Sequence, residues 1–195
     1  MKMNKSNCEK AEMLVEVLPY VNRFRDKIIV IKYGGNAMIN EDLKKAVMQD
    51  LLLMKSVGMH PILVHGGGPA INDMLKKLKV ESHFEQGLRV TDKETMEIVE
   101  MVLAGKVNKD IVGTLNQIGG KGIGLSGKDG NLIQARKKYF EKHGEKIDIG
   151  YVGHVEAVNS EMLESLIYSG YVPVISSIGM GKDGMSYNNN ADYVA

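Results

Sequence analysis

The chain has 195 residues and a formal net charge of +1, with 44% apolar and 25% charged residues, which is typical of one globular domain with a sizeable core. The balanced charge without a run of arginines gives no indication of a nucleic-acid partner. No apolar segment approaches the roughly 20 residues that cross a bilayer, so we expect no membrane association. The single cysteine, Cys8, excludes an internal disulfide framework and favours a reducing compartment, so a cytoplasmic location is expected.

A helix is predicted at the amino terminus, before the first strand. Ser6 and Glu9 have the spacing of a capping box, and apolar residues recur on one helical face as far as Phe24. Pro19 is expected to kink this helix. Because residues 1–26 precede the alternating strands and helices, two interpretations stay open: a helix docked on its own domain, or an arm that packs against another subunit.

Strands and helices then alternate, which predicts an α/β domain over residues 27–195. Strand 28–33 is followed by a helix near 40–57, and strand 60–65 by a helix that begins at about Pro69.

The middle of the chain predicts a hairpin or irregular loop over 80–91, and then two helices, over 92–103 and 106–118. Ser160 is expected to cap a further helix. The remaining strands are predicted at 121–126, 131–135, 149–158 and 171–175.

One proline and one polar segment near the end of the chain each predict a structural feature. Pro173 predicts that strand 171–175 lies at a sheet edge, or that the proline lies at a strand end. Asn188 to Asp192 is typical of a helix start, yet the sequence stops at Ala195, which predicts a truncated chain.

Two glycine-rich turns, 34–36 and 66–69, directly follow the first two apolar strands. One helix separates them, so both are expected at the same carboxyl edge of a parallel sheet, where open α/β proteins bind ligands. Glycine lets the backbone approach an anion, and the next helix offers free N–H groups. Lys32 adds a positive charge, although a lysine at a strand end also often only extends into solvent. This arrangement favours phosphoryl transfer.

Other polar residues leave alternatives open. Arg89 fits a surface ion pair and a bidentate clamp on a substrate carboxylate equally well. Asn188, Asn190 and Asp192 fit helix caps or ligand contacts. His65 is interpreted as a packing or hydrogen-bonding residue rather than a base, and no cysteine or histidine spacing predicts a metal site in the protein.

Residues 122–127 match the GxGxxG pattern of dinucleotide-binding proteins, and 122–128 resembles a phosphate-binding loop. Both motifs require a strand before and a helix after the glycines. Here a helix is predicted before them, and Asp129-Gly130 indicates a turn after them. We therefore interpret both matches as coincidental.

The sequence resembles the N-acetylglutamate kinases, a family of the amino-acid kinase fold, in ordered motifs that extend over essentially all 195 residues. The glycine motif at His65 alone would also suit carbamate, glutamate or uridylate kinases, and the segment at Arg89 narrows the choice. The motifs are Lys32-Tyr33-Gly34-Gly35-Asn36-Ala37-Met38, His65-Gly66-Gly67-Gly68-Pro69, Gly87-Leu88-Arg89-Val90-Thr91, and Asn188 to Asp192.

The resemblance implies a three-layer α-β-α sandwich with a mainly parallel central sheet, preceded by the kinked helix. It also implies a transferase of arginine biosynthesis that phosphorylates the γ-carboxylate of N-acetyl-L-glutamate with ATP, and Mg²⁺ bound through the nucleotide phosphates. Lys32 matches a catalytic lysine and Asp192 the aspartate that orients the catalytic lysines. Gly34 and Gly35 match the turn that contacts the ATP phosphates. The substrate-binding positions are matched by Gly67, Gly68, Arg89, Asn188 and Asn190.

The family continues for roughly another hundred residues, with most of the nucleotide site and a second catalytic lysine. Residues 27–195 are accordingly expected to form the acetylglutamate-binding lobe. Leu18-Pro19-Tyr20 and Arg23-Phe24-Arg25 resemble the extension of arginine-inhibited members, which implies a hexamer built from dimers, with L-arginine as feedback inhibitor. The alternatives are a related amino-acid kinase with another substrate and a non-catalytic small-molecule-binding or regulatory module of the same fold.

Overall fold

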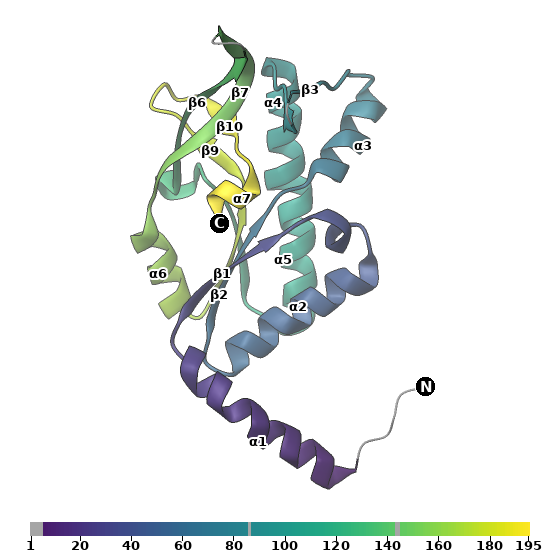
Figure 1. Ribbon diagram of the computed structural model, residues 1–195, viewed down its shortest axis with the longest axis vertical. Coiled ribbons are helices and arrows are strands. Elements are labelled where there is room, and N and C mark those ends of the chain that lie inside the picture. The colour runs from purple at the N-terminus through teal and green to yellow at the C-terminus, as the bar shows by residue number, and fades with distance from the viewer. Residues whose placement is uncertain (1–5, 86, 143–144) are drawn as a thin grey trace.

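A four-stranded parallel sheet forms the centre of the computed structural model, which describes residues 6–85, 87–142 and 145–195 (Figure 1). The strands lie in the order β1 (Ile28–Tyr33), β2 (His60–His65), β8 (Val172–Ser176) and β5 (Gly122–Ser126). Tyr33 pairs with His65, and His65 pairs with Ser176. The carboxyl ends of these strands therefore meet at one edge of the sheet, as predicted.

One layer of helices covers a face of this sheet and extends past its carboxyl end (Figure 1). They are α2 (Glu41–Ser56), α3 (Gly68–Leu78), α4 (Lys93–Glu100), a π-helical segment η2 (Met101–Val107) and α5 (Asn108–Gln117). Their buried side chains, such as Met48 and Leu115, form one core with Leu63 and Val174 of the sheet. Asn40 caps α2, its side-chain oxygen accepting hydrogen bonds from the N–H groups of Asp42 and Leu43.

The opposite face of the sheet packs against α6 (Ser160–Tyr168) and the short α7 (Ala191–Val194). Leu163 and Ile167 of α6 join Ile62 and Ile175 in a second core. Helices on both faces of a parallel sheet confirm the predicted α/β sandwich. At the start of α6, Asn159 rather than Ser160 occupies the capping position, and its side chain donates a hydrogen bond to the Gly130 carbonyl instead.

A second sheet lies at the carboxyl end of the first. Strands β6 (Ile133–Lys142) and β7 (Glu145–Val158) form a long antiparallel pair that closes into a small barrel with β9 (Ile178–Met180) and β10 (Ser186–Asn188). Both long strands extend past the predicted 131–135 and 149–158. The added residues 136–141 and 145–148 are mostly charged and none of them is buried, so they give little hydrophobic alternation.

The two helices predicted over 92–103 and 106–118 are one continuous helical rod, α4-η2-α5. Gly105 does not end it, because Val102, Leu103 and Val107 are buried in the core around it. Tertiary packing here outweighs the low helix propensity of a single glycine.

Pro173 does not mark an edge strand: β8 lies between β2 and β5. Val172 donates its N–H to Lys121 on the β5 side, so the nitrogen of Pro173 faces β2. Pairing with β2 begins only at Val174, so no ladder bond is lost. The strand-end alternative describes this proline correctly.

A short hairpin and the amino-terminal helix complete the fold. β3 (Phe84–Glu85) and β4 (Leu88–Arg89) form the hairpin predicted over 80–91. Helix α1 (Asn7–Phe24) has the predicted capping box of Ser6 and Glu9 and contains Pro19. It projects from the body (Figure 1), and none of its residues is buried. Residues 1–5 of the predicted segment 1–26 lie outside the described residues.

Candidate active site

The two glycine turns open side by side at the carboxyl edge of the sheet. The Gly66 N–H donates to the Tyr33 carbonyl oxygen at 3.3 Å, which joins the start of the second turn to the end of β1. Gly35 has a φ of 63°, in the left-handed region that favours glycine, and begins the one-turn helix η1 (Gly35–Met38). Gly67 occupies the capping position of α3, with Pro69 in the first turn of that helix.

A cavity of about 330 Å³ lies between these turns, β4 and the segment before α7. It brings together eight of the nine residues that the sequence singles out, although they come from four separate parts of the chain. These are Lys32, Gly34, Gly35, Gly67, Gly68, Arg89, Asn188 and Asn190.

The ninth residue, Asp192, reaches the site through Lys32. The Lys32 Nζ lies 3.0 Å from the Asp192 Oδ1, and both side chains are partly exposed, at 39% and 59%. A Cβ at Gly34 would lie 3.2 Å from the Lys32 Cε and Nζ, so the missing side chain leaves room for the lysine to lie over the turn. Asn190 caps α7 by accepting the Asp192 N–H at 2.9 Å, which fixes the backbone of the ion pair's acidic partner.

Arg89, at the end of β4, is buried in the cavity wall. Its guanidinium donates to the Asn72 Oδ1 at 2.6 Å and to the Ser82 Oγ, and lies 4.6 Å from the centre of the Phe84 ring. Burial lowers the pKa of Arg89, but an arginine side chain in a protein stays protonated. The structure therefore excludes the interpretation as a surface ion pair and leaves a fixed positive charge at the cavity.

Asn188, Asn189 and Asn190, which connect β10 to α7, also line the cavity. Asn188 ends β10 and its Nδ2 lies 3.4 Å from the Thr91 Oγ1. Asn190 caps α7, as one of the two interpretations predicted, and it also lines the cavity, where its contact with a ligand stays a prediction.

Sequence reasoning missed several lining residues, among them Phe84, Leu103, Ser177 and Asn189. Asn189 lies within the polar motif Asn188 to Asp192, so its place in the cavity wall could have been predicted from the sequence. Leu103 had no such signal: its place follows from η2, which brings the Leu103 Cδ2 within 2.5 Å of where a Cβ on Gly67 would lie.

The glycines at 122–127 have a packing function. Gly122 and Gly124 lie within β5, and a Cβ on Gly124 would overlap the Asn108 side chain. A Cβ on Gly127 would likewise overlap the Ile178 carbonyl. Only the three-residue 3₁₀ turn η3 (Asp129–Asn131) comes directly after them, and it leads into β6 rather than into an α-helix, which confirms that the nucleotide-motif matches are coincidental.

Two further observations concern the described parts of the chain. Over residues 6–85, 87–142 and 145–195, no three histidine, cysteine, aspartate or glutamate side chains converge as a metal-binding group. Within the same ranges, no helix combines the length and the apolarity needed to cross a membrane.

Comparison with known proteins shows close relatives. The chain is 60% identical over 187 residues to the acetylglutamate kinase of Caldicellulosiruptor bescii, and 57% identical over 197 residues to that of Moorella thermoacetica. These alignments cover 96% and 99% of this chain but only 64% and 67% of the relatives, so the chain spans about two thirds of their length.

A solved structure agrees at the level of the fold. The crystal structure of smu.665 from Streptococcus mutans superposes with a TM-score of 0.74 at 32% sequence identity, covering 86% of this chain and 65% of that one. The sequence model of the Amino acid kinase family matches residues 27–195, which is the whole chain except α1 and its surroundings. The chain therefore belongs to the amino acid kinase family.

Proposed function

We propose that the protein is an acetylglutamate kinase, which transfers the γ-phosphoryl group of ATP to the γ-carboxylate of N-acetyl-L-glutamate. The observation that carries the proposal is the meeting of Lys32, both glycine turns and Arg89 in one cavity. The relatives at 57 to 60% identity, which are named acetylglutamate kinases, support the same activity. Residues 27–195 would then form the acetylglutamate-binding lobe.

The cavity offers separate groups for the two ends of the substrate. Arg89, fixed by Asn72 and Ser82, is suited to a bidentate bond with the α-carboxylate. Gly67 and Gly68, at the amino end of α3, offer backbone N–H groups to the acceptor carboxylate. Asn188 and Asn190 complete the polar wall on the barrel side.

Lys32 and the first turn are suited to the phosphates. ATP supplies the phosphoryl group, and Mg²⁺ on its phosphates neutralises part of their charge. The absence of a side chain at Gly34, next to the Lys32 ammonium, fits a phosphate chain that lies against the backbone. Gly35 would extend the same contact surface.

The chemistry needs positioning and charge neutralisation rather than a nucleophile on the enzyme. A γ-carboxylate oxygen of the substrate attacks the γ-phosphorus, and the bond from that phosphorus to the bridging oxygen of ADP breaks, with no net proton transfer. Lys32 stabilises the negative charge on the transferred group, and Asp192 holds the Lys32 ammonium in place.

Replacing Lys32 tests this function. In the complete protein, Lys32→Ala should lower kcat by about 10²–10³, the usual cost of removing one electrostatic donor at a transition state. Lys77→Ala is the matched control, because Lys77 forms an exposed ion pair with Asp73 on α3 outside the cavity. Product is measured by trapping the acyl phosphate with hydroxylamine.

Glutamate, aspartate and UMP serve as competing acceptors in the same assay. Turnover of one of these in preference to N-acetyl-L-glutamate would establish a related kinase instead. Selective binding of N-acetyl-L-glutamate with no phosphorylation by the wild-type protein would establish a non-catalytic module.

A further inference from the structure

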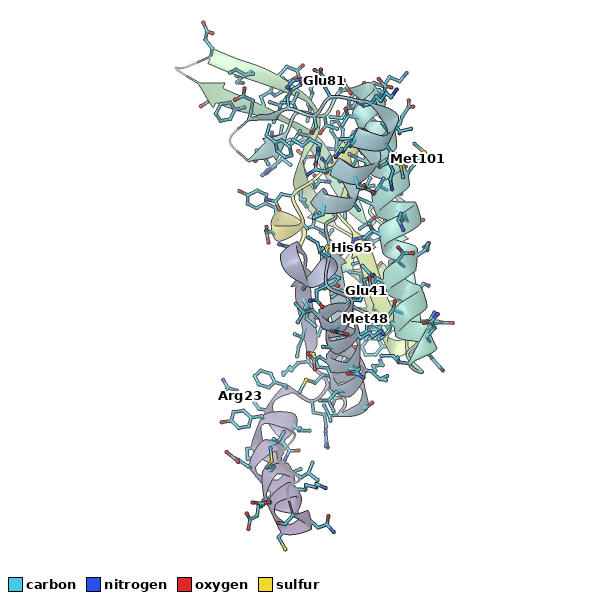
Figure 2. All side chains as sticks on the ribbon, turned by 90° about the vertical axis from the view of Figure 1, so that its right-hand side faces the viewer. Arg23, Glu41, Met48, His65, Glu81 and Met101 are labelled. Carbon is cyan, nitrogen blue, oxygen red and sulfur yellow. The ribbon has the colours of Figure 1, made fainter. Side chains whose placement is uncertain are left out.

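His65 ends β2 inside the molecule and has no exposed surface (Figure 2). It directly precedes the glycine turn Gly66–Gly68, yet the chemistry proposed above does not use it. Its ring contacts the turn on one side and Asn108, the first residue of α5, on the other. Because each ring nitrogen has one polar partner, the donor or acceptor character of that partner determines which nitrogen carries a proton.

The contacts assign each ring nitrogen. Nδ1 lies 2.8 Å from the Gly66 carbonyl oxygen, which can only accept, so Nδ1 carries the proton. Nε2 lies 3.0 Å from the Asn108 Nδ2, which can only donate, so Nε2 is unprotonated. The ring is therefore the neutral Nδ1–H tautomer. Burial and the nearby Lys109 lower the pKa of His65, whereas its bond to Gly66 acts in the opposite direction, and the net lowering agrees with this assignment.

Asn108 has no freedom to reverse its amide. Its Nδ2 also lies 2.9 Å from the Val174 carbonyl oxygen, while its Oδ1 accepts from the Lys109 Nζ at 3.2 Å. A side chain on Gly124 would occupy the same space, so the glycine at this position keeps the amide within reach of His65. The tautomer of His65 is thus specified from α5, β5 and β8 together.

We propose that His65 is a positioning residue, whose Nδ1–H fixes the orientation of the Gly66–Gly67 peptide and thereby aims the Gly67 N–H at the substrate. The peptide is planar and trans, since the described residues contain no cis bond, so its N–H points opposite to its C=O. Holding the Gly66 carbonyl toward the core turns the Gly67 N–H outward, on the side where Gly67 lines the cavity.

The turn needs such a restraint because it consists of three successive glycines. Without a Cβ, each has access to a wide range of backbone angles, and ordering them has a high entropic cost. A hydrogen bond from the rigid end of β2 lowers that cost before the substrate binds. The inference rests on the proposed function, because it takes N-acetyl-L-glutamate as the ligand of the turn.

The tautomer is measured first, on the wild-type protein without ligand. In ¹⁵N-histidine-labelled protein at neutral pH, the two ring nitrogens of His65 should show one protonated Nδ1 and one unprotonated Nε2. An imidazolium, or the Nε2–H tautomer, overturns the proposal whatever the enzyme's substrate is.

Binding of N-acetyl-L-glutamate to the complete protein, measured by calorimetry, tests the consequence. His65→Leu removes the donor and should raise Kd about tenfold, because the free energy of about one hydrogen bond no longer helps to order the turn before binding. His65→Asn places an amide donor near the Nδ1 position and should restore Kd to within about threefold of wild type. His60→Leu, at the other end of β2, is the matched control and should leave Kd unchanged.

Four outcomes of these experiments are distinguished. Equal Kd values for wild type and His65→Leu overturn the proposal, and so does a His65→Asn protein that binds as weakly as His65→Leu. If His65→Leu does not fold, as judged by circular dichroism, the comparison of His65→Asn with wild type and the tautomer measurement still decide the question. A wild-type protein that fails to bind N-acetyl-L-glutamate overturns the proposed function instead.

Discussion

Arg89 is positioned by three neighbouring side chains, of which only Phe84 also lines the cavity. Asn72 of α3 accepts one of its hydrogen bonds at 2.6 Å, Ser82 accepts another, and Phe84 covers the guanidinium face. An arginine held on several sides loses little side-chain entropy when it binds a carboxylate. The affinity for the substrate should therefore depend on Asn72 although Asn72 is exposed and lines no part of the cavity.

Asn72→Ala should raise the Kd for N-acetyl-L-glutamate about tenfold, because a hydrogen bond to a charged group is worth about 1.5–3 kcal/mol and part of it is recovered by water. Calorimetric titration measures the change. Asp73→Ala, at the neighbouring exposed position that pairs with Lys77, is the control and should bind as wild type. An unchanged Kd in Asn72→Ala would show that Ser82 and Phe84 position the arginine without it.

His65 also predicts how stability depends on pH. Burial lowers its pKa in the folded state, so below the ordinary value of about 6.5 the unfolded chain binds a proton that the folded chain does not. The free energy of unfolding should fall as the pH drops below about 6.5, by at most about 1.4 kcal/mol per pH unit for this one group, with no such dependence above it.

Urea unfolding between about pH 5 and 8 measures this dependence. His65→Asn does not titrate, so its stability should fall less steeply below pH 6.5 than that of the wild type. Parallel curves for the two proteins would contradict a lowered pKa at His65.

At the level of the elements, Glu100 connects α4 to β10 and to the segment after β5 through hydrogen bonds. It ends α4, its Oε1 accepts from Lys128 after β5 at 2.8 Å, and its Oε2 accepts from Ser186 of β10 at 2.6 Å. Burial raises the pKa of Glu100, but the hydrogen bonds from Lys128 and Ser186 outweigh it, so that the net pKa is lowered. The carboxylate thus stabilises the junction of the rod with the barrel.

Glu100→Gln should lower the free energy of unfolding by about 0.5–1.5 kcal/mol at neutral pH, since the carboxylate is partly screened by water. Because the pKa of Glu100 is lowered in the folded state, the difference is present above its ordinary value of 4.5 and disappears as the pH falls through the folded pKa. Urea unfolding at several pH values measures it, with Glu97→Gln, exposed one turn earlier on α4, as control. A difference that persists in acid would contradict a charge-dependent contribution.

Local sequence signals predicted the elements that depend on them. Asn40 and the apolar stripe defined α2, and Pro69 marked the start of α3, because capping and periodicity are properties of adjacent residues. The continuity of α4 and α5 through Gly105 and the central place of Pro173 depend on packing and pairing with distant segments, which no local pattern contains.

The residues of the candidate site also fall into a group that local motifs predict and a group that they do not. The glycine turns, Lys32 and Arg89 stand in recognisable motifs, whereas Asn72 and Asn108 act on those motifs from other helices. Their side chains become meaningful only when the chain has folded, so the residues that support the site were not visible in the sequence.

At the level of the whole molecule, the exposed helix α1 indicates how subunits assemble. Its apolar side chains stay exposed, including Leu14 at 71% and Leu18 at 51%, and a stripe of this kind on a projecting helix is typical of an interaction surface. We propose that it packs against the same helix of another subunit and so joins dimers into a hexamer. We also propose that L-arginine inhibits the activity of that hexamer by feedback.

Deletion of residues 1–26 from the complete protein should leave dimers, as measured by light scattering after size-exclusion chromatography, and should weaken inhibition by L-arginine. The thermal stability of the remaining domain should change little, because α1 buries none of its residues. Leu14→Glu combined with Leu18→Glu should have the same effect on assembly without shortening the chain. A hexamer in either variant would contradict the proposal.

The π-helical segment has a consequence for how this protein tolerates changes in length. The Asn108 N–H bonds to the carbonyl five residues earlier, at Leu103, so η2 holds one residue more than an α-helix would over the same turn. Removing one residue between Leu103 and Asn108 should therefore convert this turn to regular α-helix and leave the Asn108 N–H bonded to Leu103. Asn108 would then keep its place against His65, and every site residue would keep its identity. A gene that loses one codon there would encode a shorter helix with the same arrangement at the site, because the π-helical segment absorbs the missing residue.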